Sequence, residues 1–338
     1  MSIFLKQVIK YIFIIFSFGY AIIYVSILVK PGKMLGDATE YEIWKLKSKL
    51  TDNYYSKPQN IIIGDSRGMA ALNPTIIKHN TINLSLGGAT TFEGFSTIKK
   101  FLSQNRIDTL ILCYGIFHYT ESDVFENRTL LYQFNPIVDI NNLEKVEKKY
   151  NITIDNKKPS YFLYLNRRSI YYNLPTNLRP TFLENLKQNN YHKYIIDILR
   201  ENLGFCNFGK ASTATGKDRE VEIATEKKKF IINPILASYL DSIYDTSTRN
   251  HIKIAFVIPP INYSSYKTLK TTDYWKAYIK FRESLNSKYP EMEFYNKYTY
   301  LPDSYFGDPS HFNIKGSIFF SNYIKKELFD KDKLKVSM

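Results

Sequence analysis

The stretch that most constrains the fold is NIIIGDSRGM, residues 60–69. Its isoleucine run favours a buried β-strand, and the turn formed by Gly64, Asp65 and Ser66 ends that strand before small residues that suit the start of a helix. A strand that breaks at a glycine places the next hydroxyl at the carboxyl edge of a sheet, where open α/β folds build their sites. Ser66 is therefore the first candidate nucleophile. A serine hydroxyl is a weak nucleophile at neutral pH, so this role requires a histidine to accept its proton and a carboxylate to orient that histidine.

Short apolar segments alternate with helical patterns along most of the chain. Strands are expected at residues 60–63, 81–84, 109–113, 253–258 and 293–295. Helices are expected near residues 66–72, 92–105, 234–247, 273–288 and 314–329. Strands separated by right-handed helical crossovers predict an α/β three-layer sandwich with a parallel, five-stranded sheet.

The N-terminal segment YIFIIFSFGYAIIYVSILV, residues 11–29, contains no charged residue. At about 1.5 Å per helical residue it nearly spans a hydrocarbon core of about 30 Å. A cleaved signal peptide is the competing interpretation, but the run is long for one and no Ala-x-Ala site follows it. We expect a single uncleaved membrane anchor over residues 1–30. The positive-inside rule does not set its orientation, because two lysines precede the run and two closely follow it.

The anchor is followed by a predicted stalk or linker at residues 31–56 and a catalytic-type domain at residues 57–338. Residues 38–50 have a weakly amphipathic helical pattern. That helix is expected either to act as a stalk or to pack on the edge of the sheet.

An insertion is expected at about residues 120–250, where the alternation of strands and helices stops. It has helical patterns at residues 143–150 and 191–203. The polar, Gly/Ser/Thr/Lys-rich residues 206–226 predict a mobile loop. We expect the insertion to form a cap or a partner-binding lobe over the site.

The composition is that of a globular protein, with 44% hydrophobic and 23% charged residues. A formal net charge of +14 has two open explanations: a general lysine-rich bias, or a preference for an anionic membrane or polymer. No compact basic run interleaved with aromatic residues is present, so a nucleic-acid partner is not expected. The 5 histidines and 2 cysteines show no metal-ligand spacing. Cys113 lies in an apolar strand pattern as a buried thiol, and a disulfide with Cys206 stays open.

A second polar motif, DPSH at residues 308–311, lies near the other end of the chain. Asp308 and His311 are close enough in sequence for one tight turn to carry both a base and the carboxylate that orients it. Between the two motifs, NLSLGGATT contains Gly88, where a side chain would obstruct a substrate carbonyl. The backbone N–H groups of Ser66 and Gly88 are the expected oxyanion donors. Each motif also occurs as an ordinary turn, and Asp65 is expected to bind its turn backbone rather than to serve as the triad acid.

Together these blocks resemble the SGNH (GDSL-type) esterase and acyltransferase superfamily. The resemblance covers about residues 59–115 and 253–329 and leaves the insertion unmatched. It implies a flavodoxin-like order for the sheet. It also implies Ser66 as the nucleophile, His311 as the general base and Asp308 as the orienting carboxylate, with no metal or organic cofactor.

One block departs from the family pattern. Family members usually carry Gly-x-Asn after the third strand, where the asparagine amide is a third oxyanion donor. Here the stretch is YGIFHY, in which Gly115 matches and Phe117 occupies the asparagine position. Loss of such a donor costs about 3 to 4 kcal/mol of transition-state stabilisation, which argues against efficient free hydrolysis. His118 either donates instead or is structural, and Arg67 either holds an anionic substrate or pairs with an acidic residue.

The anchor and the altered SGNH motifs resemble membrane-anchored proteins that work beside multi-span membrane acyltransferases, as in alginate O-acetylation and D-alanylation of lipoteichoic acid. This resemblance implies that the domain lies outside the cytoplasm. It also implies that Ser66 accepts an acyl group, expected to be acetyl, and that a hydroxyl of a cell-surface polysaccharide takes it with His311 as base. With water as the acceptor, the same groups would form an esterase or deacetylase. The alternative from another class is a non-catalytic, membrane-tethered assembly protein, which Phe117 and the insertion favour.

Overall fold

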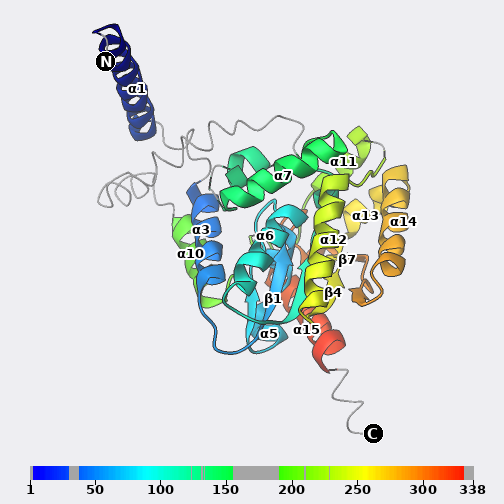
Figure 1. Cartoon of the computed structure of the whole chain (residues 1–338). Coiled ribbons are helices and arrows are strands. Elements are labelled where there is room, and N and C mark those ends of the chain that lie inside the picture. Colours follow the sequence, from blue (N-terminus) through cyan, green and yellow to red (C-terminus); the bar gives the residue numbers. More distant parts are fainter. Residues whose placement is uncertain are drawn as a thin grey trace.

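The computed structural model describes residues 3–29, 38–122, 124–130, 132, 134–154, 190–208, 211–227 and 229–330 (Figure 1). Residues 31–37 of the predicted linker and 155–189 of the predicted insertion lie outside these ranges. The described residues form an α/β domain built on a parallel sheet, and one N-terminal apolar helix.

The central sheet has 5 strands in the order β2-β1-β3-β4-β6, and all of its strand pairs are parallel. The strands are β1 (Gln59–Gly64), β2 (Thr81–Asn83), β3 (Ile107–Cys113), β4 (Lys253–Val257) and β6 (Met292–Tyr295). Taking these strands in chain order, the first lies between the second and the third, which is the flavodoxin-like arrangement. The predicted α/β fold class is therefore confirmed.

Helices cover both faces of this sheet. Ile61 and Ile63 of β1 belong to one core cluster and Ile62 belongs to another, because successive side chains of a strand point to opposite faces. The helices that contribute to the first cluster include α6 (Thr91–Leu102), α12 (Pro234–Arg249) and α14 (Asp273–Lys288). The helices that contribute to the second are α4 (Ser66–Ala71), α5 (Pro74–Ile77) and α15 (Ile314–Lys325).

The prediction of a mobile loop at residues 206–226 is wrong for residues 219–226. Residues Arg219–Lys227 form helix α11, which buries Glu220, Val221, Ile223 and Ala224. The polar residues that suggested a solvated loop include Asp218 and Glu220, whose side chains are buried inside the domain. Another part of the insertion, α7 (Ile137–Tyr150), begins earlier than the predicted residue 143, and α10 spans Asn190–Glu201.

Three short elements were not predicted from the sequence. Strand β5 (Ile261–Asn262) pairs in parallel with β7 (Tyr300–Leu301), and α13 (Tyr263–Leu269) follows β5 directly. β5 and α13 follow β4 in the chain, and β7 precedes the segment that carries His311.

Helix α3 (Ala38–Asp52) packs against the domain. Of the two predicted alternatives, a stalk or a helix packed on the edge of the sheet, the second is the one observed. Ile43 and Trp44 are buried, and the helix contacts α6 and α10. Lys47 is also fully buried, and its Nζ donates to the carbonyl oxygens of Asn83, at 2.6 Å, and Gly204. Burial lowers the pKa of Lys47 well below its ordinary value. Helix α3 is thereby joined to the end of β2.

The N-terminal helix α1 (Ile3–Val29) contains a 19-residue stretch, Phe4–Ile22, that is long and apolar enough to cross a membrane. Its large apolar side chains, such as Phe13 and Phe16, are exposed.

Both cysteines, Cys113 and Cys206, are buried in the domain and free, so the disulfide left open by the sequence is not formed.

Candidate active site

Ser66 lies at the carboxyl end of β1, as the first residue of α4. Asp65 caps this helix, because its Oδ1 accepts hydrogen bonds from the backbone N–H groups of Arg67, at 2.9 Å, and Gly68, at 3.3 Å. A Cβ at Gly64 would lie 1.9 Å from the carbonyl oxygen of Cys113. Only glycine therefore lets the end of β1 approach β3 closely enough to place Ser66 at the edge of the sheet.

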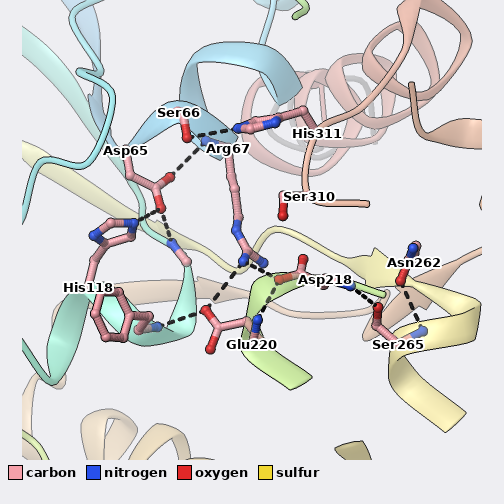
Figure 2. A network of polar contacts seen from close by, with 12 residues as sticks. Asp65, Ser66, Arg67, His118, Asp218, Glu220, Asn262, Ser265, Ser310 and His311 are labelled. Atoms are coloured by element: carbon pink, nitrogen blue, oxygen red, sulfur yellow. Dashed lines mark hydrogen bonds and ion pairs between the residues drawn. The ribbon is translucent and has the colours of Figure 1, made fainter. Parts of the chain in front are cut away.

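The structure brings Ser66 and His311 together from opposite ends of the chain. His311 Nε2 lies 2.8 Å from Ser66 Oγ (Figure 2), and His311 Nδ1 lies 2.9 Å from Asp308 Oδ2. Asp308 Oδ1 also accepts the backbone N–H groups of Ser310 and His311, both at 2.8 Å. One tight turn therefore carries the imidazole and its carboxylate. Phe208, from the insertion, packs edge-on against the His311 ring with centroids 5.2 Å apart.

The carboxyl group of Asp308 is ionised at neutral pH. Burial opposes its ionisation, but the hydrogen bond and charge of His311 and the N–H groups of Ser310 and His311 outweigh burial and lower the pKa of Asp308. A carboxylate on the far imidazole nitrogen favours the tautomer in which the nitrogen facing Ser66 can accept a proton. The geometry is that of a nucleophile, a base and an orienting acid.

Gly88 lines the same cavity as Ser66 and His311, and it has a left-handed backbone conformation with φ +77°. A Cβ at Gly88 would meet Val124 Cγ2 at 2.6 Å. The cavity has a volume of about 200 Å³, and the residues around it include Ser66, Gly88, His118, Arg128, Arg219 and His311. The two backbone N–H groups expected as oxyanion donors therefore belong to Ser66 and Gly88, which line one cavity.

Asp65 binds the turn backbone, as predicted. Besides capping α4, its Oδ2 accepts the Gly115 N–H at 2.9 Å and pairs with His118 Nε2 at 3.0 Å. Burial opposes ionisation of Asp65, but His118, Arg67 and the Gly115 N–H outweigh it and lower the pKa to about 2. The other ring nitrogen of His118 faces away from Ser66 in Figure 2. Of the two predicted alternatives for His118, its contacts support the structural one.

The stability contribution of Asp65 is expected to depend on pH. Because its pKa in the folded state is about 2, below the ordinary 3.8, the carboxylate stabilises the fold above the ordinary value. The contribution is lost as the pH falls through the folded-state pKa, and the shift corresponds to about 2 kcal/mol. Urea unfolding should therefore show stability falling more steeply below about pH 4 for the wild type than for Asp65→Asn. Equal slopes would contradict this account.

Arg67 pairs with acidic residues, which is the second alternative predicted for it. Its Nη2 lies 2.8 Å from Asp218 Oδ1 and 3.3 Å from Glu220 Oε1, and all three side chains are nearly or fully buried. Glu220 Oε1 also accepts the Phe117 N–H at 2.9 Å, and its Oε2 accepts the Tyr274 hydroxyl at 3.3 Å. Burial raises the pKa of Glu220, and Arg67 opposes that rise. This network joins α4, the turn after β3 and helix α11 (Figure 2).

Phe117 occupies the position of the family asparagine and supplies no side-chain donor. Its ring is buried, and the guanidinium group of Arg219 lies 5.1 Å from the ring centroid. Asp218, Arg219 and Glu220 were missed as site residues because they fall in the stretch predicted to be a loop. Two acidic residues, Asp218 and Glu220, stand at the start of a helical pattern, and this was the one sequence feature that could have marked them. It does not indicate that their partner is Arg67.

No cluster of at least three His, Cys, Asp or Glu side chains that could hold a metal ion is found among the described residues. Among the described charged groups near Ser66, Asp65, Arg67 and Asp308 pair with other side chains or bind backbone N–H groups. Their arrangement can lower the barrier to proton transfer and bind a developing negative charge through N–H donors.

The fold and the site define an α/β protein with a serine, a histidine and an aspartate in one hydrogen-bonded line at the edge of its sheet. No family model matches the chain, and no curated protein matches it. A solved structure described as a "putative platelet activating factor from Streptococcus pneumonia" aligns over 90% of this chain and 99% of that chain. The two share 13% sequence identity, with a TM-score of 0.38. Function must therefore be inferred from the site.

Proposed function

We propose that the chain is a membrane-anchored serine O-acyltransferase of the SGNH type. It transfers an acyl group, expected to be acetyl, to a hydroxyl of a cell-surface polysaccharide. The observation that carries the proposal is the line from Ser66 Oγ to His311 Nε2, at 2.8 Å, and from His311 Nδ1 to Asp308, at 2.9 Å. Both distances lie within the range over which a proton passes directly between two groups.

In the first half-reaction, His311 Nε2 takes the Ser66 proton as Oγ forms a bond to the acyl carbon of the donor. The negative charge moves to the carbonyl oxygen, where the N–H groups of Ser66 and Gly88 can bind it. The bond between the acyl carbon and the donor oxygen then breaks, and the leaving oxygen receives the proton from His311. The product is an acyl ester of Ser66. Throughout, the Asp308 carboxylate stabilises the positively charged imidazole.

In the second half-reaction, the acceptor hydroxyl gives its proton to His311 and attacks the acyl carbon. Ser66 is the leaving group and recovers the proton, so the enzyme returns to its starting state. A water molecule as acceptor gives the alternative esterase or deacetylase. The resemblance to anchored proteins that partner multi-span acyltransferases favours transfer, and it is also the basis for placing the domain outside the cytoplasm.

A non-catalytic assembly protein is the second candidate, and Phe117 at the asparagine position favours it. The line of hydrogen bonds at Ser66 weighs against this candidate. A protein that only binds a partner has no need for an imidazole placed between a serine hydroxyl and a carboxylate.

The two candidates predict opposite results with a serine-reactive fluorophosphonate. The full-length chain in detergent is expected to be labelled, and Ser66→Ala is expected to lose the label because its nucleophile is gone. Ser103→Ala, at an exposed serine after α6, is the control and should label like the wild type. Absence of labelling in the folded wild type would favour the binding protein, and labelling that moves to Ser310 would reassign the nucleophile. Product analysis with polysaccharide and water in competition then separates transferase from esterase.

A further inference from the structure

The loop that carries Gly88 is held by a side chain from another part of the chain. Arg128, from η2 (Phe125–Leu130), donates from Nη1 to the carbonyl oxygen of Gly87 at 2.8 Å. The Gly87 carbonyl and the Gly88 N–H belong to the same peptide unit. Because that unit is planar and trans, the two groups point in opposite directions. A donor that fixes the carbonyl therefore also fixes the direction of the N–H.

Arg128 is in turn held by Glu40, in the first turn of α3. Arg128 Nη1 lies 3.1 Å from Glu40 Oε2, and the two side chains are 26% and 19% exposed. A partly buried pair of this kind is less screened by solvent than a surface pair. The positive charge next to the Gly87 carbonyl also polarises the peptide unit and strengthens its N–H as a donor.

The Arg128 and Glu40 side chains lie where a side chain at position 87 would be, which explains why a second glycine precedes Gly88. A Cβ at Gly87 would lie 2.8 Å from Arg128 Nη1 and 2.9 Å from Glu40 Oε2. Any side chain there would displace the pair. The sequence Gly87-Gly88 thus has two separate requirements: room for the Glu40 and Arg128 side chains at the first position, and a left-handed backbone at the second.

We propose that Arg128, held by Glu40, is a positioning residue that aims the Gly88 N–H at the oxyanion. The inference rests on the proposed acyl transfer, since it assigns a role within that reaction. The oxyanion donor is set by α3, the helix that follows the membrane anchor in the chain, so the anchor-proximal segment is part of the catalytic apparatus and not a passive stalk.

The test is steady-state hydrolysis of 4-nitrophenyl acetate by the full-length chain in detergent, with Ser66→Ala as the blank. Arg128→Gln is expected to lower kcat by about 10- to 100-fold with KM nearly unchanged, less than the about 10²- to 10³-fold expected for complete loss of a donor. Arg128→Lys should recover part of kcat, because an ammonium can still donate to the Gly87 carbonyl. Glu40→Gln should lower kcat less, and it should add little to Arg128→Gln because both changes act on one contact.

Arg200→Gln is the matched control, because Arg200 lies in an exposed ion pair with Asp197 on α10, and its kcat should not change. Thermal unfolding of each variant separates loss of positioning from loss of fold, and Arg128→Lys keeps the test open if Arg128→Gln does not fold. An active wild type with an unchanged kcat in Arg128→Gln, or a change confined to KM, would overturn the inference alone. A wild type without Ser66-dependent turnover would instead overturn the proposed function on which it rests.

Discussion

Replacing His311 with glutamine is expected to lower Ser66-dependent acyl transfer by about 10⁴- to 10⁶-fold, because residues of a proton-relay line act as a unit. Glutamine can still hydrogen-bond to the Ser66 hydroxyl, but it cannot accept its proton at neutral pH. The measurement is the rate of 4-nitrophenyl acetate turnover at saturating substrate. Substrate binding should change little. In the bound complex before reaction, His311 contacts the Ser66 hydroxyl, and it transfers protons only once the reaction begins.

A matched histidine distinguishes this effect from a general effect of removing an imidazole. His79 is exposed near the turn before β2, and His79→Gln should leave the rate unchanged. A His311→Gln variant that folds and retains more than about a hundredth of the wild-type rate would show that another group serves as the base. His118 would then be the first residue to test, because it lines the same cavity.

Replacing Arg67 with methionine is expected to lower the free energy of unfolding by about 3–5 kcal/mol, because the change leaves two buried carboxylates without their cation. Asp218 and Glu220 have side chains no more than 1% exposed, so water cannot take the place of the guanidinium group. Urea unfolding followed by tryptophan fluorescence is the measurement. The 2 tryptophans, Trp44 and Trp275, are both buried in the domain and report on its unfolding.

Two comparisons make this prediction specific. Lys148→Ala removes an exposed pair with Glu144 and is expected to cost no more than about 1 kcal/mol. Adding Asp218→Asn and Glu220→Gln to Arg67→Met should restore part of the lost stability, because no buried charge then lacks a partner. If Arg67→Met cost as little as Lys148→Ala, the buried network would not anchor α11 to the nucleophile turn.

The layers of the fold were predictable because they depend on local patterns. The isoleucine run of β1 and residues 110–113 of β3 are continuously hydrophobic, as strands covered on both faces must be. The start of α4 at Ser66 follows from the glycine break and the capping ability of Asp65, both of which are local. The short spacing of Asp308 and His311 likewise allowed their mutual contact to be expected.

The walls of the site were not predictable in the same way. Asp218 is separated from Arg67 by 151 positions in the chain, and no periodicity links them. The polar stretch that contains Asp218 and Glu220 predicts a solvated loop by composition, whereas burial with Arg67 makes it part of the interior. Glu40 belongs to the helix expected either to act as a stalk or to pack on the edge of the sheet, and no pattern predicted that it reaches Arg128 beside the Gly87 carbonyl.

The sequence by itself determined which segments form the central sheet, where a serine follows the first strand, and which histidine has a carboxylate beside it. Those properties depend on residues a few positions apart, so hydrophobic periodicity and turn chemistry are sufficient to infer them. Only the tertiary structure decided that His311 meets Ser66, that Arg67 is neutralised by α11, and that Arg128 and Glu40 meet at Gly87. Each of these contacts joins distant segments, and its distance depends on how the whole chain packs around the sheet.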